Sequence, residues 1–370
     1  MANPDRDRLL RTFVRLAEVD SPSRREGQLA QLVRQELADL GWHVRDDASG
    51  PDCGNVIASL PGSERLEPVL FASHMDVVMP CLGVRPEVSE GLVTSSGDTV
   101  LGADAKASVA ALLEAARLLA AEPPLARPLV ELVFTWAEEV GHLGAKAFDV
   151  GGVQSRRAWV LDGLVPVGTI IVAAPTYYSF AARVIGRAAH AGVEPESGIS
   201  AIAIAAAAIS RLTWGRLDES TTANVGTIVG GSARNAVPAE AALEGEVRSL
   251  SAARAAEVVQ RVESTFREAA AAAGADLNLR IVEEYAGYQL AEDDPIVGDA
   301  RAAFESLDTG RRVELVTTGG GSDANEFNAR GLHACVLGIG AEYCHSVRER
   351  IGVDELDLLT RWVLRLAELA

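Results

Sequence analysis

The predicted order of helices and strands changes abruptly in the middle of this chain of 370 residues. Up to residue 175, strands alternate with amphipathic helices, which is typical of an α/β domain with a mainly parallel sheet and helices on both faces. Residues 176–284 instead follow the order β-α-β-β-α-β of a ferredoxin-like α+β domain. Alternation resumes over residues 285–370. The sequence therefore predicts an α/β domain interrupted by a smaller inserted domain.

Several predicted buried strands of the α/β domain end close to side chains that can bind metal ions. These side chains are His74, Glu138, Glu139, Asp162 and His345. In open α/β sheets, ligands bind beyond the carboxyl ends of the strands, so we expect these residues to share one rim. Histidines and carboxylates gathered at one rim indicate a candidate metal site.

Each of these residues also has an ordinary structural explanation. Adjacent glutamates are usually a solvated surface, and a single histidine is more often structural than a ligand. A further candidate, Asp104, has the position of a simple helix cap. The combination, in this order and on compatible elements, favours the metal site. His43, His142 and His333 lie in a β run, a glycine turn and a strand start, and we assign them no ligand role.

The composition of the chain indicates which partners are disfavoured and in which compartment the protein is expected. The chain has 34 lysines and arginines against 52 acidic residues, a formal charge of −18, which disfavours nucleic acid and anionic membranes as partners. Its four cysteines form no C-x-x-C pair, and the first residues lack the apolar segment of a secretory signal. No apolar run is long enough to span a membrane. These features predict a cytoplasmic protein with reduced thiols.

Five short motifs resemble the metal-site motifs of the dizinc superfamily of peptidase T, carboxypeptidase G, acetylornithine deacetylase and aminoacylase. They are S-H-M-D-V-V at 73–78, G-A-D-A-K-A at 102–107, A-E-E-V-G at 137–141, V-L-D-G at 160–163 and C-H-S-V-R-E at 344–349. G-R-A-A-H-A-G at 186–192, N-A-V-P at 235–238 and E-V-R-S at 246–249 resemble its lid domain. The resemblance covers nearly the whole chain and is closest to the peptidase-T-like branch.

The resemblance implies two divalent metal ions per chain, with zinc expected first and cobalt or manganese as alternatives. His74 and Asp162 would hold one ion, Glu139 and His345 the other, and Asp104 would bridge the two. Two nitrogen and three carboxylate ligands suit such borderline ions. The resembling enzymes also hold the peptide bond after the bridging aspartate in cis, so Asp104–Ala105 is expected to be cis.

The resemblance further implies that Glu138 is the general base, acting on a water that bridges the metals. It also implies that Asp76 fixes the tautomer and the ring orientation of His74 without binding a metal itself. In an extended backbone, adjacent side chains point to opposite sides, so Glu139 can ligate while Glu138 faces the water.

In the inserted domain, His190, Asn235 and Arg248 match positions that bind the substrate, and Gly320 and Gly321 lie in a glycine-rich loop that matches a lining of the same cleft. Arg248 has the alternative explanation of an exposed charge at a strand end. Because the inserted domain has its own element order and is joined to the remainder by two chain crossings, we expect it to move as a rigid lid. A homodimer through this domain is implied by the resemblance alone. The sequence leaves open whether His190 acts in its own chain's site or a partner's.

The expected function is hydrolysis of an amide bond in small peptides, as by a peptidase-T-like exopeptidase. An N-acyl-amino-acid deacylase on the same site is the alternative, although aspartate at position 162 resembles the peptidase side. A different class, a non-catalytic peptide-binding protein, would not need the general base Glu138. The substrate is accordingly expected to be a small peptide or an acyl-amino acid.

Overall fold

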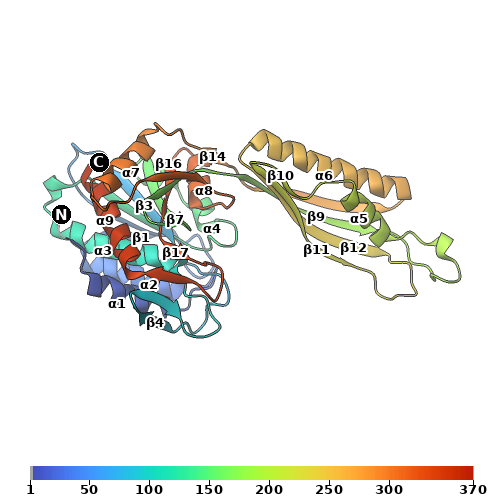
Figure 1. The fold of residues 1–370 in the computed structure, drawn as a ribbon, viewed down its shortest axis with the longest axis horizontal. Coiled ribbons are helices and arrows are strands. Elements are labelled where there is room, and N and C mark those ends of the chain that lie inside the picture. The colour runs from blue at the N-terminus through green and yellow to red at the C-terminus, as the bar shows by residue number, and fades with distance from the viewer. Residues whose placement is uncertain (1–2, 370) are drawn as a thin grey trace. The chain divides into compact units, whose positions relative to one another are not determined.

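The computed structural model describes residues 3–369, which divide into two compact units (Figure 1). The first contains the chain up to Ala173, Leu290–Thr318 and the chain from Ser322 onward. The second contains Ala174–Gln289 together with Gly319–Gly321. The sequence-based limits of the insertion, 176 and 284, lie a few residues inside those of the second unit.

The first unit is built on a mixed sheet whose central strands are parallel. Its strands are β1 (His43–Asp46), β2 (Val56–Leu60), β3 (Val69–His74), β6 (Val130–Thr135), β7 (Arg157–Gly163), β8 (Thr169–Ala174), β15 (Glu314–Thr317) and β16 (His333–Gly338). Their order is β1-β2-β6-β3-β7-β16-β8, and β15 pairs with β8. β6, β3, β7 and β16 run parallel to one another. Every residue of β3 and β6 is buried, as expected for parallel strands covered on both faces.

Helices flank this sheet in the first unit (Figure 1). They are α1 (Arg6–Ala17), α2 (Gly27–Asp39), α3 (Ala103–Ala121), α4 (Leu143–Ala147), α7 (Pro295–Glu305), α8 (Asp323–Ala329) and α9 (Val353–Leu369). The alanine-rich α3 is the central helix, because it packs on β3 and β7 and is itself covered by α1 and α9. On α9, Trp362 meets Phe304 of α7 edge to face, with ring centroids 5.0 Å apart.

A separate small sheet of the first unit has the order β17-β18-β5-β4. Its strands are β4 (Pro86–Ser89), β5 (Leu92–Ser95), β17 (Ala341–Glu342) and β18 (Arg350–Gly352). It joins a hairpin that follows β3 to the segment that carries His345. In this way an early and a late part of the chain are held together.

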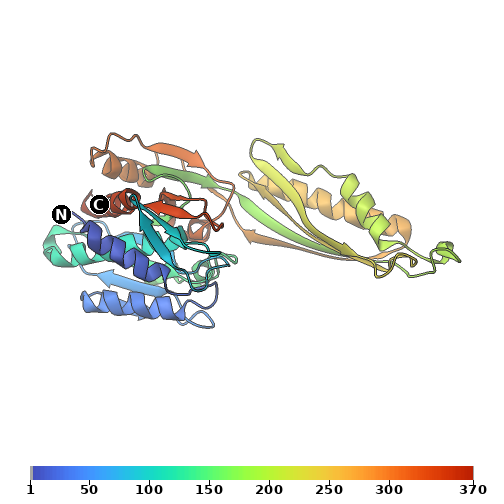
Figure 2. The same ribbon diagram turned by 60° about the horizontal axis from the view of Figure 1, so that its bottom comes forward.

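The second unit is an antiparallel sheet with two helices packed on one face (Figure 2). The strands are β9 (Thr176–Ile185), β10 (Gly215–Asp218), β11 (Thr221–Gly230), β12 (Glu240–Ser249) and β13 (Asp276–Tyr285), and the helices are α5 (Ala201–Ser210) and α6 (Ala252–Ala273). Their order in the sheet is β10-β11-β12-β9-β13. A short strand, β14 (Tyr288–Gln289), follows in the chain but is not part of this antiparallel sheet. Along β12, burial alternates at the start of the strand, as expected when one face carries the helices.

The α/β class with a mainly parallel central sheet and an additional α+β unit is confirmed. The sequence analysis did not predict the short strands β4, β5, β10, β14, β17 and β18, the longer strand β8, or the helices α4 and α8. Most of these elements are four to seven residues long, too short to show a clear periodicity. All four cysteines are free thiols. Within residues 3–369, no helix combines the length and the apolar character that crossing a membrane requires.

Candidate metal centre and active site

Five predicted ligands lie together in the first unit. His74 is the last residue of β3, Asp162 is near the end of the neighbouring strand β7, and Glu139 follows the end of β6. Because these three strands are parallel, their carboxyl ends meet at one edge of the sheet. Asp104 begins α3, and His345 lies between β17 and β18. The structure thus brings all five to one place, while their role as ligands remains a prediction.

The two oxygens of Asp104 face different histidines. Oδ1 lies 3.1 Å from Nε2 of His74, and Oδ2 lies 3.2 Å from Nε2 of His345. His74 also lies 3.3 Å from Oδ1 of Asp162, and His345 lies 3.1 Å from Oε1 of Glu139. The donors therefore form two sets that share Asp104. Ligand atoms of His74, Asp104 and Glu139 all lie within 4.8 Å of one another.

His74 presents the correct nitrogen for metal binding. Its Nδ1 lies 3.0 Å from the backbone carbonyl oxygen of Asp76, an atom that only accepts hydrogen bonds. When a metal ion is bound, that contact would keep the proton on Nδ1 and leave the lone pair of Nε2, which faces Asp104 and Asp162, available to the ion. A neutral imidazole held in this tautomer is the form in which histidine binds metals.

The ionisable groups at this site have strongly shifted pKa values. Burial raises the pKa of Asp162 to about 7, with His74 opposing this and other carboxylates adding to it. Burial likewise raises the pKa of Glu139 and, together with the charge of Asp162, that of Glu138. The hydrogen bonds that His345 donates to the carboxylates of Asp104 and Glu139 raise its pKa to about 10. In the metal-free protein these groups therefore tend to hold protons, and divalent ions between the donors would take the place of those protons.

The donor set fits two divalent ions. It offers two imidazole nitrogens and three carboxylates, a combination that suits zinc, cobalt or manganese. Asp104, whose two oxygens face the two histidines, would be the residue shared by both ions. The Asp104–Ala105 peptide bond is cis, as the resemblance led us to expect. Glu349, which the sequence analysis had assigned no role, accepts the N–H groups of Gly102 (2.7 Å) and Asp104 (3.0 Å) and so holds the segment that presents the bridge.

Asp76 fixes the backbone of the glutamate pair. Its Oδ1 accepts the N–H of Glu138 at 2.8 Å and its Oδ2 accepts the N–H of Glu139 at 3.2 Å. Oδ1 also lies 3.4 Å from Nδ1 of His74, and Oδ2 accepts the hydroxyl of Ser23 at 2.6 Å. The buried carboxylate therefore positions both the histidine and the two glutamates, which is more than the support of His74 that the resemblance implied.

A second buried carboxylate, Glu26, extends this anchorage by one residue. Its Oε1 accepts the N–H of Ala137 at 3.0 Å and that of Arg24 at 2.6 Å. Burial and the nearby charge of Asp76 raise the pKa of Glu26 to about 7. Three successive backbone N–H groups, those of residues 137–139, are thus held by two carboxylates. The sequence analysis did not identify Glu26 or Ser23, because they belong to a turn far from the strands that carry the motifs.

Glu138 is buried and has a neighbour that the sequence analysis had set aside. Nε2 of His142 lies 3.2 Å from Oε1 of Glu138. Asp323, at the start of α8, is also close enough to raise the pKa of Glu138 through its charge. Asp323 accepts the hydroxyl of Thr135 at the end of β6, and burial raises its own pKa to about 7. His142, to which the sequence analysis gave no ligand role, therefore contacts the predicted base.

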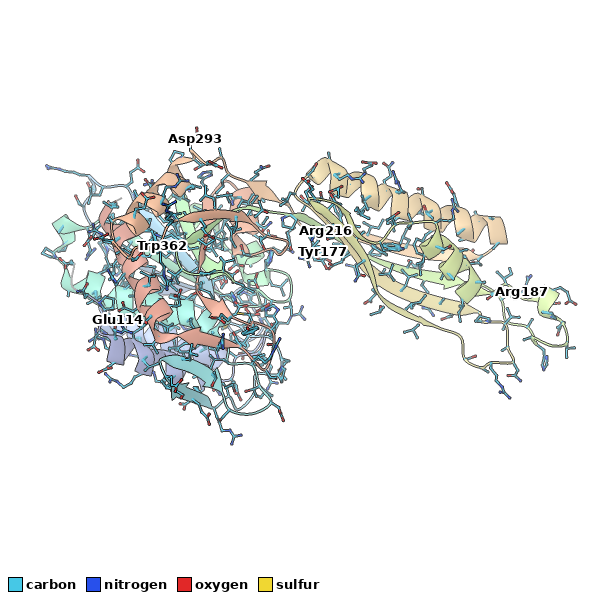
Figure 3. All side chains as sticks on the ribbon, viewed as in Figure 1. Glu114, Tyr177, Arg187, Arg216, Asp293 and Trp362 are labelled. Carbon is cyan, nitrogen blue, oxygen red and sulfur yellow. The ribbon has the colours of Figure 1, made fainter. Side chains whose placement is uncertain are left out.

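Arg248 is held at one end of the sheet in the second unit. Its guanidinium lies 4.1 Å from the ring centroid of Tyr177, which Figure 3 labels, and it pairs with Glu246 at 3.2 Å. It also donates to the hydroxyl of Tyr285 at 3.0 Å and to the carbonyl of Gly319 at 3.3 Å. Gly320 and Gly321 follow directly and belong to the same unit. The predicted arginine and the glycine-rich loop are therefore neighbours.

His190 and Asn235 lie at the other end of that sheet. His190 pairs with Ala236, and the carbonyl of Asn235 accepts the N–H of Ala191 at 3.0 Å. Figure 3 marks the two ends of β9 with Tyr177 and the nearby Arg187. Ten residues of β9 separate these ends, a length of about 30 Å. Arg248 and His190 of one chain are thus too far apart to hold one small substrate together.

Comparisons with known proteins identify the family of this chain. The family model of Peptidase family M20/M25/M40 matches residues 70–369. The chain is 39% identical over 365 residues to the uncharacterized protein YqjE of Bacillus subtilis strain 168, and this match covers 98% of each protein. The crystal structure of aminopeptidase PepT from Bacillus cereus has a TM-score of 0.91 and 36% identity, with 99% of this chain and 98% of that one covered. That of a tripeptidase from Staphylococcus aureus has a TM-score of 0.94 and 33% identity, with 100% and 99% covered.

These matches extend over the α/β unit and the inserted unit alike, so they concern the whole architecture and not one motif. They agree with the resemblance to the peptidase-T-like branch that the motifs suggested. We conclude that the chain belongs to peptidase family M20/M25/M40 and is a metallopeptidase of its peptidase-T-like branch.

Proposed function

We propose that this metallopeptidase is an exopeptidase that hydrolyses an amide bond of small peptides. It would hold two divalent ions, with zinc as the expected metal and cobalt or manganese as the alternatives. The observation that carries the proposal is the division of the donors into two sets that share Asp104, beside a glutamate, Glu138, that belongs to neither set. His74 and Asp162 would hold one ion, and Glu139 and His345 the other. When bound, the pair of ions would acidify a water and stabilise negative charge on the carbonyl oxygen.

Glu138 would act as the general base and then as the general acid. Its carboxylate takes a proton from the attacking water and returns it to the leaving amine, so no other proton donor is needed. The hydrogen bonds that Asp76 accepts fix the backbone from which the side chains of Glu138 and Glu139 extend. Burial and the charge of Asp162 raise the pKa of Glu138, which makes its carboxylate a stronger base and favours uptake of the proton from the water.

Arg248 would bind a carboxylate of the substrate. Tyr177, Tyr285 and Glu246 hold its guanidinium in one place, which reduces the entropy that is lost when a ligand binds. Recognition of a free terminal carboxylate favours short peptides over proteins. The backbone of Gly320 and Gly321, beside Arg248, offers further polar groups to the peptide.

We also propose a homodimer in which the two ends of the inserted unit serve different sites. The length of β9 separates His190 and Asn235 from Arg248, so a substrate held by Arg248 is beyond the reach of His190 from the same chain. A second copy would supply the missing histidine. Exposed apolar residues of this unit, Ile228 and Val229 of β11, are available for such an association.

A panel of substrates tests the proposed function. The protein is stripped of metal, reloaded with zinc, cobalt or manganese, and assayed with dipeptides, tripeptides and the matching N-acetyl amino acids. We expect metal-dependent hydrolysis of the short peptides, and no hydrolysis by the stripped protein. Faster hydrolysis of the N-acetyl amino acids would instead establish the deacylase alternative, and binding of peptides without hydrolysis would establish the non-catalytic class.

A further inference from the structure

His142 is joined to Glu138 through both the backbone and the side chain. The carbonyl of Glu138 accepts the N–H of Gly141 at 3.0 Å and that of His142 at 2.8 Å, so the chain turns back on itself directly after the glutamate pair. His142 has a left-handed backbone conformation, with φ of 56°, and precedes α4. This turn directs its ring back toward Glu138, with Nε2 at 3.2 Å from Oε1.

The ring of His142 has a carboxylate on each side. Only 6% of its side chain is exposed, and Nδ1 lies 4.0 Å from Oε1 of Glu326 on α8. Glu326 in turn lies 3.9 Å from Nζ of Lys146 on α4. α4 and α8 pack against each other, so the ring is enclosed between elements that are themselves fixed. A buried side chain with this enclosure has little freedom to leave Glu138.

We propose that His142 is a positioning residue for the general base, a role that rests on the proposed function of Glu138. Its Nε2–H donates to Oε1 of Glu138 and leaves the other carboxylate oxygen to take the proton of the water. A glutamate has several rotatable bonds, and a free carboxylate beside two divalent ions would be drawn into coordination. The hydrogen bond from His142 holds Glu138 away from the metals.

Two substitutions at this position separate the donor from the volume of the ring. His142→Gln keeps an N–H donor near the place of Nε2, whereas His142→Leu keeps the size and removes the donor. We expect His142→Leu to lower kcat about 10- to 100-fold, the range for a hydrogen bond to a charged group, with KM and melting temperature little changed. His142→Gln should recover most of kcat. His333→Leu is the matched control and should keep kcat. Nε2 of His333 lies 2.8 Å from Oδ1 of Asp294, and neither residue belongs to the candidate metal centre.

Metal binding gives a readout that does not depend on turnover. If Glu138 is released toward the metals in His142→Leu, the affinity for the zinc ions, measured by competition with a chelating dye, should rise or stay equal and should not fall. A fall would mean that His142 supports the metal centre as a structural element, and it would overturn the proposal. Unchanged kcat in folded His142→Leu would overturn it as well.

Should His142→Leu fail to fold, His142→Asn takes its place, because asparagine tolerates the left-handed backbone and its shorter amide falls short of Glu138. The double variant with Glu138→Gln then decides whether His142 acts through the base. We expect no further loss of kcat when the histidine is replaced in the Glu138→Gln background, and an additive loss would contradict the proposal.

Near-normal turnover of Glu138→Gln alone would refute the proposed role of Glu138 as the base. That result is distinguishable from a failure of the proposal for His142, which the single variants at position 142 test.

Discussion

Nε2 of His345 lies 3.1 Å from Oε1 of Glu139, although 206 positions separate the two residues in the sequence. The inserted unit occupies much of that interval. The last part of the chain therefore returns to the first unit to complete the candidate centre. Its other four donors come from the first 162 residues.

This relationship predicts the effect of removing His345. His345→Ala leaves His74, Asp104 and Asp162 in place, so the protein should keep one ion and lose the other, with turnover lowered by at least about 100-fold. Metal analysis of the dialysed protein measures the stoichiometry. His333→Ala, which removes a histidine outside the centre, should retain two ions, and two ions in His345→Ala would contradict the assignment.

The anchorage by Asp76 predicts a combined loss of stability and metal affinity. Asp76→Ala leaves the N–H groups of Glu138 and Glu139 buried without their acceptor, and we expect about 2–5 kcal/mol of stability to be lost and zinc to bind about 10- to 100-fold more weakly. Denaturant unfolding and zinc competition measure the two effects. Glu131 is a suitable control, because it also accepts backbone N–H groups, those of Gln154 and Ser155, and Glu131→Ala should lower stability without changing zinc affinity.

Glu26 should make the metal-free protein less stable at high pH. Burial raises its pKa in the folded state to about 7, above the ordinary value of 4.5, so the folded state binds this proton more tightly than the unfolded state does. The free energy of unfolding should therefore fall as the pH rises from about 4.5 to 7. Glu26→Gln cannot ionise and should show a shallower decline over this range in urea titrations. Parallel curves for the two proteins would show that Glu26 stays ionised in the folded state.

The parts of the fold and of the site that the sequence predicted are those marked by apolar strands with polar residues at their ends. β3, β6 and β7 are apolar runs that end in polar residues, so both the parallel sheet and the position of His74, Glu139 and Asp162 followed from a local pattern. Glu26, Ser23 and His142 follow no such pattern, because their roles come from turns that tertiary packing brings to the glutamate pair. The distance between Arg248 and His190 depends on the register of β9 and β12, which only the structure supplies.

The separation of Arg248 and His190 predicts complementation between two inactive variants. Arg248→Ala and His190→Ala are expected to be nearly inactive as separate proteins. Mixed dimers, purified through a different tag on each chain, should regain about half of the wild-type activity, because one of their two sites carries both residues. A dimer that stays inactive would show that His190 does not serve the partner's site, and a protein that is monomeric in solution would contradict the homodimer.

The most direct test of the central claim is the comparison of Glu138→Gln with Glu139→Gln, in which turnover and metal content are measured on the same samples. If Glu138 is the base and Glu139 a ligand, Glu138→Gln keeps the fold and both ions while kcat falls by about 10²- to 10⁴-fold. Glu139→Gln should lose or weaken one ion, and its activity should fall with the metal content. Near-normal kcat in Glu138→Gln, or loss of an ion from it, would contradict the account.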